Sequence, residues 1–444
     1  MKVLHITPHL GGGVGSVLRS YLEFQSRTSQ NSHKVLLLEH INSDSRELFD
    51  YIGVPFHENV YSSKELLSQE VSCHDVILIH WWNHPLLQEL LMNYCFPKNR
   101  MVFWCHIAGS QAPNVICDFV LDYPDEFVFT TPLSNFVPSV AANQLRNRGM
   151  RDYIWSTVGF ESIDNHNLIP QNRRFENTNR NLTYCGNLDE TKIHADFFNI
   201  FSEIETSKFH LDIVGPPTSF FDNLSYSTSG VKYTYHGFVS EQIKFEILSR
   251  TRIFVYPLAR HHYGTCDQSI QEAMIFGIPV VVLNNPMESY MVKHAKTGYV
   301  AKSISEMVHY VEVLLEDESQ CKILSSQAQE EARMRFSIEK MSRQWDAKFH
   351  ALYSLPMNEK VPLSVKYGRP LSPAEVLSES LGIHGAIFQD YLRNQSKFEG
   401  LEIEAQIASL GSNPSWKSPT KSSISHYAAF FDDEVINAWK KMTS

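Results

Sequence analysis

The sequence predicts an α/β protein in which two doubly wound parallel-sheet domains precede a helical C-terminal extension. Two stretches of the chain alternate short apolar strands with segments of helical periodicity, a pattern typical of parallel sheets. Between them, residues 163–181 are polar and almost without periodicity, which indicates a linker or a long surface loop. The alternation ends near Tyr353, and the residues beyond it carry helical patterns without a series of strands.

Apolar runs mark the strands of both stretches. In the first stretch we expect strands at 2–7, 34–39, 75–81, 101–106, 126–131 and 152–158. In the second stretch we expect strands at 181–186, 210–215, 231–237, 252–257 and 278–283. The last of these strands contains the apolar run VVVL, which is preceded by glycine and proline and followed by asparagine and proline. A continuous apolar run of this kind is typical of a buried parallel strand.

These elements predict four parts. They are a first Rossmann-like domain (1–165), a second one (166–337), a closing helix (338–354) and the extension (355–444). In the extension, Ser372 and Pro373 suit the N-cap and the first position of a helix. Its apolar segments HYAAFF and VINAW predict either docking on the first domain or assembly into a homo-oligomer.

The composition narrows the class of protein. A net charge of −10 argues against nucleic acid as a partner. There is no apolar run of about 18 residues, as a membrane span requires, and no leader pattern at the N-terminus. The seven cysteines lack CxxC spacing, so we expect reduced thiols, a cytoplasmic location and no metal site.

Functional residues are expected on the loops that follow the strands, because open α/β sheets bind ligands at the carboxyl ends of their strands. Two Rossmann-like domains that face each other would place these loops around a shared cleft. The loops that we expect there are 11–15, Glu39, 80–84, 106–110, 186–192, 215–217, 236–237 and 257–272.

The second stretch contains TYCGNLDETK, HLDIVGPP, YHGFVS and QEAMIFGIPVVV, in this order. These motifs and their order are the basis of a resemblance to the family 4 glycosyltransferases of the GT-B fold. It covers about 181–353, extends more weakly to 1–160 through the glycine-rich loop and CHIAG, and does not include 355–444. The last of the four motifs is the most specific, because helix, glycine stop and buried strand all follow the family's pattern.

This resemblance implies a retaining transfer of a sugar from a nucleotide-diphosphate donor, with UDP or GDP as the nucleotide, to an acceptor hydroxyl. The acceptor would be a glycan, a lipid-linked sugar or a small molecule, in glycan or polysaccharide biosynthesis. The family's mechanism needs neither metal nor cofactor. The resemblance to this family also implies peripheral contact with the inner face of a membrane.

The resemblance places Glu272 on the ribose of the donor. A carboxylate can accept two hydrogen bonds from a vicinal diol, and the start of a helix favours its negative charge. The alternative is a capping box, since Ser269 and Glu272 have the spacing for one.

The diphosphate position departs from the family's pattern. Lys192 lies at the place of the family's lysine, whereas Asn187 replaces its arginine and so removes a charged, bidentate donor. A plain solvated lysine is the alternative for Lys192. Gly215, after the next strand, is also expected on the donor side. Arg260, His261 or His262 could supply a compensating charge.

The sugar position departs as well, because Gly264 stands where the family has a second glutamate. The backbone of Gly264, Thr265 and Cys266 could donate N–H groups to the sugar or phosphate. Asp267 could supply the missing carboxylate, or it could cap the helix that follows. Glu288, in a later loop, is a further donor-side candidate.

In the first domain, Gly12, Gly13 and Gly15 follow the first strand, and we expect a helix to begin at Ser16. By resemblance this loop approaches the donor phosphate or the acceptor. The alternative is a tight turn whose glycines only permit close packing. By the same resemblance, the motif CHIAG implies that His106 orients the donor sugar. The expected catalytic residues are then His106, Lys192 and Glu272. The alternative for His106 is a purely structural role.

The segment HWWNH suggests an acceptor subsite formed by His80, Trp82 and His84, because indole rings stack on sugars. Aromatic packing between strand and helix is the alternative.

Two other functions of the protein stay open. One is a degenerate nucleotide-sugar-binding partner subunit, which the losses at 187 and 264 favour. The other is a sugar-nucleotide epimerase or hydrolase, for which Glu39 and Glu126 lie near strand ends.

Overall fold

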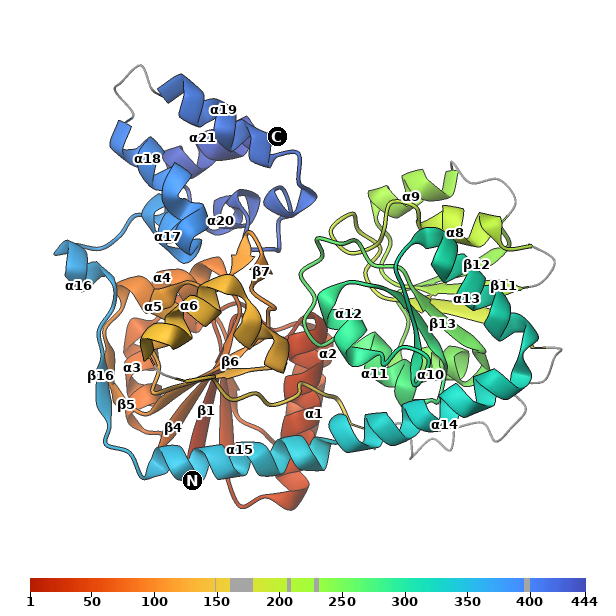
Figure 1. The fold of residues 1–444 in the computed structure, drawn as a ribbon. Coiled ribbons are helices and arrows are strands. Elements are labelled where there is room, and N and C mark those ends of the chain that lie inside the picture. The colour runs from red at the N-terminus through yellow and green to blue at the C-terminus, as the bar shows by residue number, and fades with distance from the viewer. Residues whose placement is uncertain (148, 160–178, 206–208, 227–230, 395–399) are drawn as a thin grey trace. The chain divides into compact units, whose positions relative to one another are not determined.

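The computed structural model describes the chain except for residues 148, 160–178, 206–208, 227–230 and 395–399 (Figure 1). The chain forms two compact units, one of residues 1–156 with 341–444 and the other of residues 157–340. The predicted boundary at 165/166 and most of the predicted linker lie outside the described residues.

The first unit is built on a six-stranded parallel sheet in the order β3-β2-β1-β4-β6-β9. Its strands are β1 (Lys2–Thr7), β2 (Ser32–Leu37), β3 (Phe56–His57), β4 (Val76–Trp81), β6 (Met101–Cys105) and β9 (Glu126–Phe129). The strand expected at 152–158 is wrong, since only a single bridge joins Tyr153 to Phe129. All six residues of β4 are buried, because helices cover both faces of the sheet.

The helices of this part alternate with the strands, as the sequence predicts. They are α1 (Gly12–Thr28), α2 (Ser43–Ile52), η1 (Val60–Ser62), α3 (Lys64–Ser72), α4 (Pro85–Asn93), α5 (Asp118–Asp122), η2 (Pro132–Phe136) and α6 (Pro138–Asn147). A short hairpin of β7 (Ser110–Gln111) and β8 (Asn114–Val115), which the sequence did not predict, follows β6.

The closing helix α15 (Ile338–Tyr353) packs on the first unit. Gln25 donates to the Ser342 hydroxyl over 2.8 Å, and the rings of Trp104 and Trp345 lie 5.1 Å apart. The next residues add a strand that the sequence did not predict. This strand, β16 (Asn358–Lys360), pairs antiparallel with β5 (Phe96–Asn99).

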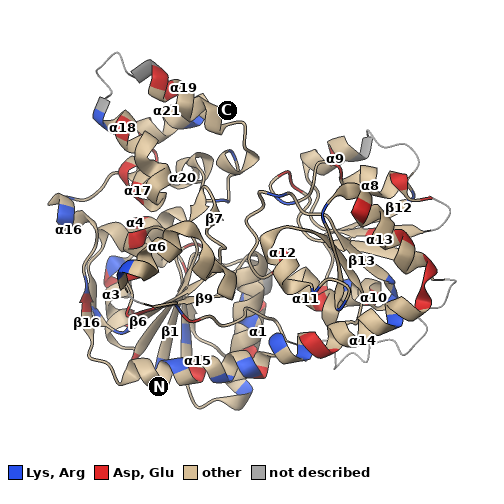
Figure 2. Ribbon diagram, in the orientation of Figure 1, with Lys and Arg blue, Asp and Glu red and all other residues tan. Residues whose placement is uncertain are grey.

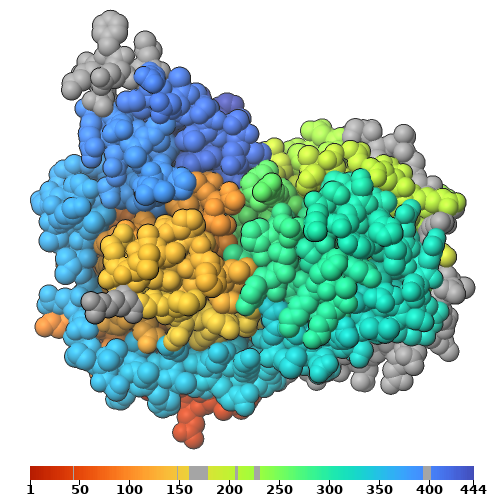
Figure 3. Space-filling view, in the orientation of Figure 1, coloured from red at the N-terminus to blue at the C-terminus, as the bar shows by residue number. Residues whose placement is uncertain are grey.

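The extension is helical, as predicted, and belongs to the first unit. Its helices are α16 (Ser364–Tyr367), α17 (Pro373–Ser380), η5 (Gly382–Gly385), α18 (Ala386–Asn394), α19 (Gly400–Leu410), η6 (Pro414–Trp416), α20 (Ile424–Phe430) and α21 (Glu434–Thr443). Ser372 is the N-cap of α17 and forms a capping box with Glu375, which confirms the predicted helix start. Trp416, Tyr427 and Trp439 are buried in its own core, and Figure 3 shows the extension in blue against the orange residues of the same unit.

The second unit repeats the design with the order β12-β11-β10-β13-β14-β15, all parallel. Its strands are β10 (Asn181–Cys185), β11 (His210–Val214), β12 (Tyr233–Gly237), β13 (Ile253–Tyr256), β14 (Val280–Leu283) and β15 (Gly298–Ala301). The five predicted strands are confirmed with small shifts of their ends, and β15 was not predicted. Its helices are α8 (Phe197–Glu203), α9 (Ser219–Tyr226), α10 (Glu241–Arg250), α11 (Gln268–Ile275), α12 (Pro286–Met291), α13 (Ile304–Glu316) and α14 (Glu318–Arg335).

Charges of both signs are scattered over the helices on the face drawn in Figure 2. Arg146, at the end of α6, pairs with Asp118 at 2.6 Å, and Arg151 pairs with Asp122 at 3.3 Å. Among the residues described, no helix combines the length and the hydropathy that crossing a bilayer requires. Peripheral contact with a membrane stays a prediction.

The glycine-rich loop departs from the prediction, because α1 begins at Gly12 rather than at Ser16. Gly12 has a φ of 62°, in the left-handed region. A Cβ atom on Gly15 would lie 1.8 Å from the carbonyl oxygen of Leu10. Close approach between the first turn of α1 and the preceding loop therefore requires Gly15, as the packing interpretation expected.

We predict that Gly15→Ala destabilises the first unit by more than about 1–3 kcal/mol, because a main-chain oxygen cannot move aside as a flexible side chain can. Urea unfolding at equilibrium measures the change. Gly149→Ala is the control, since a Cβ there meets no atom within 4 Å. Equal stability of the two variants would contradict the packing argument.

Candidate functional site

Both sheets have the Rossmann strand order, so each has a point where the direction of winding reverses. In the first unit this point lies between β1 and β4, and in the second it lies between β10 and β13. Ligands of such sheets bind at the carboxyl ends of the strands near this point. In the second unit, the loops that follow these strands carry Lys192 and Asp267.

In the second unit, Lys192 forms an ion pair with Asp267 beyond the ends of β10 and β13. Lys192 is only 6% exposed, so it is not a plain solvated lysine. The backbone places it, since its N–H donates to Asp189 and its carbonyl accepts from Ala259. The Tyr256 hydroxyl also donates to Asp267, over 3.3 Å.

The two partners keep each other charged despite their burial. Burial raises the pKa of Asp267, but the charges of Lys192 and His262 outweigh it, so the net shift is downward. Burial likewise lowers the pKa of Lys192, and the carboxylate of Asp267 more than restores it. A buried ion pair of this kind persists only while both partners are present.

A second carboxylate joins this network from α12, the helix that follows β14. Glu288 is fully buried, and its Oε1 lies 2.9 Å from Nε2 of His262. One side-chain nitrogen or oxygen atom from each of His262, Asp267 and Glu288 lies within 4.8 Å of the other two. The sequence pointed to Glu288 only through its place after a strand; its pairing with His262 depends on the tertiary structure.

Glu272 lies in the second turn of α11 and is 3% exposed. Its Oε1 accepts from Nζ of Lys244, which lies 2.6 Å away on α10. The capping-box alternative is wrong, because α11 begins at Gln268 and Ser269 is already inside the helix. Asp267 occupies the N-cap position, but its side chain makes no cap hydrogen bond.

The Lys244–Glu272 pair was not expected from the sequence. Burial lowers the pKa of Lys244, but the carboxylate of Glu272 raises it above its usual value. A carboxylate offers about four lone-pair sites, so the bond to Lys244 leaves capacity for a further donor on Glu272.

The remaining donor-side candidates surround this network. Asn187 donates to the Tyr263 hydroxyl over 3.4 Å, and the N–H of Gly264 donates to Nδ1 of His262 over 2.9 Å. Thr265 and Cys266 are buried between Gly264 and the start of α11. Gly215 is required by packing, because a Cβ there would lie 2.0 Å from the carbonyl oxygen of Gly186.

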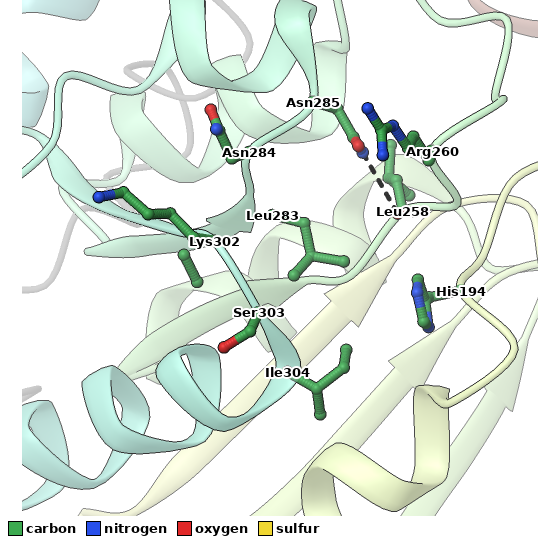
Figure 4. Close-up of a pocket in the computed structure, with 10 residues that line it drawn as sticks. His194, Leu258, Arg260, Leu283, Asn284, Asn285, Lys302, Ser303 and Ile304 are labelled. Carbon is green, nitrogen blue, oxygen red and sulfur yellow. Dashed lines mark hydrogen bonds between the residues drawn. The ribbon is translucent and has the colours of Figure 1, made fainter.

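A pocket of about 300 Å³ opens beyond β13, β14 and β15 (Figure 4). Its polar lining includes Arg260, Asn284, Asn285 and Lys302. Neither Lys192 nor Glu272 lines it, so the pocket is separate from the two buried ion pairs.

In the first unit, four histidines form a hydrogen-bonded chain across neighbouring strands. His33 on β2 lies 2.9 Å from His5 on β1, His5 lies 3.1 Å from His80 on β4, and His80 lies 3.1 Å from His106 after β6. His80 was predicted to form part of an acceptor subsite. This interpretation is wrong, because His80 is 0% exposed inside β4 and both its ring nitrogens are bonded.

The chain of histidines is neutral at ordinary pH. Burial lowers the pKa of His33 to about 4 and that of His80 to about 3, and it also lowers those of His5 and His106. A neutral imidazole has one donor and one acceptor, so all the tautomers in the chain must point the same way. The orientation of His106 is therefore coupled to three buried residues.

The other predicted residues of the first unit lie after β1 and β4. Trp82 packs edge-on against His9, with ring centroids 5.3 Å apart, and His84 is buried at the start of α4. The contact of Trp82 agrees with aromatic packing, the alternative to a sugar subsite, and a subsite that includes Trp82 and His84 stays a prediction. Whether the two sheets share a cleft stays a prediction.

Comparison with known proteins identifies the second unit. Residues 166–331 match the family model described as glycosyl transferases group 1. These residues are therefore similar to the glycosyl transferases group 1 family. The match includes Lys192, Lys244, Asp267, Glu272 and Glu288. A search of curated protein sequences gives no significant match.

Solved structures support the same fold for both units of the glycosyltransferase-like chain. Anabaena HepE in complex with UDP and glucose aligns over 79% of this chain and 100% of its own, at 13% identity and a TM-score of 0.59. Sucrose-phosphate synthase from Thermosynechococcus elongatus aligns over 80% and 100%, at 13% identity and a TM-score of 0.60. A variant of TarM from S. aureus, in complex with UDP among other ligands, aligns over 80% and 100%, at 10% identity and a TM-score of 0.57. The predicted GT-B class of two Rossmann-like domains is confirmed.

We predict that Lys192→Met destabilises the second unit by about 3–5 kcal/mol, because it leaves the buried Asp267 without its cation. The double variant Lys192→Met/Asp267→Asn should recover part of this loss. Urea unfolding measures both. Lys322→Met, which breaks an exposed pair with Glu318, is the control and should cost less than about 1 kcal/mol. No recovery in the double variant would contradict the ion-pair argument.

We also predict that stability falls as the pH falls from about 6.5, the ordinary pKa of histidine, to about 4, the value for His33. In this window the unfolded chain binds the proton that folded His33 excludes, at about 1.4 kcal/mol per pH unit for each such histidine. Urea unfolding across this range should show a shallower slope for His33→Gln. The control His40→Gln, at an exposed position, should keep the slope of the wild type; identical slopes in all three proteins would refute a neutral His33.

Proposed function

We propose that this protein transfers a sugar from a nucleotide-diphosphate donor to an acceptor hydroxyl. The observation that carries the proposal is the buried Lys192–Asp267 and Lys244–Glu272 pairs at the carboxyl edge of the second sheet, within the residues that match the glycosyl transferases group 1 model. Fold alone does not decide function, so the argument depends on these groups.

The chemistry needs an anion-stabilising group and a ribose acceptor. As the acceptor oxygen bonds to the anomeric carbon, the bond to the donor diphosphate breaks and negative charge develops on the leaving phosphate. Lys192 is the cation that we assign to this charge, with Asp267 holding it in place. Glu272 is the group that we assign to the ribose hydroxyls. The acceptor's proton leaves with the diphosphate, so no separate base is needed.

Several finer features belong to the same proposal. The complexes of similar proteins with UDP support UDP as the nucleotide, with GDP as the other candidate. Retention of configuration, transfer of a hexose, a part in polysaccharide biosynthesis and action on the cytoplasmic side of a membrane follow from the family resemblance. We propose them on that ground.

A second candidate is a partner subunit that binds a nucleotide sugar without catalysis. Two observations favour it: Asn187 replaces the cationic side chain at the diphosphate, and Lys192 is already paired with Asp267. In that case, fewer positive charges would face the leaving diphosphate than sugar transfer requires.

Nucleotide binding tests the site directly. We expect one of UDP, GDP, ADP and CMP to stabilise the wild type by about 2.7 kcal/mol at 100 times its Kd, a rise in Tm of several degrees. Glu272→Gln keeps the shape of the side chain but removes its charge, so the rise should largely disappear. Thermal unfolding with and without each nucleotide measures both effects.

Glu246→Gln, which changes an exposed glutamate on the neighbouring helix α10, is the matched control and should keep the shift of the wild type. If a nucleotide binds but the corresponding nucleotide sugars are neither transferred nor hydrolysed, the binding subunit is the correct function. If no nucleotide stabilises the wild type, both forms of the proposal are wrong.

A further inference from the structure

Three potential metal ligands converge at the carboxyl edge of the first sheet. His9 follows β1, Glu39 follows β2 and His84 follows β4, which are neighbouring strands in the order β2-β1-β4. Each offers one ligand atom, and these atoms lie within 4.8 Å of one another. The topology brings together residues that are up to 75 positions apart in the sequence.

The spacing suits a tetrahedral ion. Nε2 of His84 lies 3.2 Å from Oε1 of Glu39. Ligands at about 2.0–2.1 Å from a zinc ion in tetrahedral geometry are about 3.3 Å apart. The two atoms are thus as far apart as two ligands of one zinc ion.

The cluster contains buried polar atoms without hydrogen-bond partners. His84 is 1% exposed, and neither of its ring nitrogens has a hydrogen-bond partner. Oε1 of Glu39 is also buried without one, because the contact to His84 lacks hydrogen-bond geometry. Buried polar groups in native proteins are nearly always satisfied, so this cluster calls for a further ligand.

We propose that His9, Glu39 and His84 bind one divalent ion of the zinc class and leave a fourth coordination position open. Two imidazoles and one carboxylate are ligands that zinc prefers, whereas magnesium and calcium prefer oxygen alone. Sites with three protein ligands keep a position for water or substrate. This proposal is independent of the proposed sugar transfer.

The protonation of the ligands agrees with metal binding, which requires neutral imidazoles. Burial lowers the pKa of His84 well below its ordinary value, and His9 lowers it further. Burial also lowers the pKa of His9; Lys421 adds to this effect and Glu39 opposes it. Burial raises the pKa of Glu39, against the influence of His9, and a bound cation would favour its charged form.

Binding requires one rearrangement at His9. Its Nδ1 accepts a hydrogen bond from the N–H of Gly11 over 3.0 Å. A neutral imidazole has one lone pair, so a ring that gives this pair to a metal cannot also accept from Gly11. Metal binding should therefore release the Gly11 amide at the start of α1.

The extension covers this site. The rings of His426 and Phe430, on α20, lie 4.8 and 5.0 Å from the ring of His84. Both contacts are edge-to-face, and the ring of Trp82 also packs edge-to-face against His84, with centroids 5.8 Å apart. An apolar shell of this kind limits the access of water and orients the ligands.

Zinc titration of the full chain, after removal of metal with a chelator, tests the proposal. We expect one tightly bound Zn²⁺ per chain by isothermal titration calorimetry, and much weaker binding of Mg²⁺. Glu39→Gln and His9→Gln, which preserve approximate size, should each weaken Zn²⁺ binding by at least about 100-fold. Bound Co²⁺ should give the intense visible bands of a four-coordinate ion in the wild type and lose them in both variants.

The matched control is His40→Gln, because His40 lies next to Glu39 in sequence and forms an exposed pair with Glu58 at 3.5 Å. It should bind Zn²⁺ as the wild type does. Thermal unfolding without metal checks that each variant is folded. The proposal is overturned if the wild type binds no Zn²⁺ at one per chain, if both ligand variants bind as well as the wild type, or if His40→Gln abolishes binding.

Discussion

Parallel strands that are covered on both faces leave polar side chains little room except where the strands end. The second sheet follows that constraint at its site: β14 is apolar, whereas Lys192 and Asp267 come from the loops that follow β10 and β13, and Glu288 comes from α12, which follows β14. The strand order brings these loops together, so the sheet topology determines which charged groups meet. The first sheet departs from it, because His5, His33 and His80 are buried within strands and hydrogen-bond to one another.

The buried charges then depend on one another. Asp267 is charged because Lys192 and His262 lie beside it, and Lys244 is charged because of Glu272. Such pairs are costly to form and more costly to break, which is typical of functional sites rather than of stabilising contacts. A donor with a diphosphate and a ribose presents the complementary groups, an anion and two hydroxyls.

The first unit instead buries uncharged histidines within its strands. Its four-histidine chain crosses β2, β1 and β4 to reach His106, while His9, Glu39 and His84 gather after the same strands. The extension contributes His426 and Phe430 to the surroundings of His84. It therefore packs at the edge of the first sheet where His84 lies.

The sequence by itself determined the alternation of strands and helices, the two sheets, the capped helix of the extension and the family that the second unit resembles. These follow from local periodicity and from short motifs, which act over a few residues. Only the tertiary structure decided that Glu272 meets Lys244, that His262 meets Glu288, that His80 is buried among histidines and that His9 approaches His84. Each of these contacts joins different loops or elements, and their partners are set by strand order and packing, which no single stretch of sequence contains.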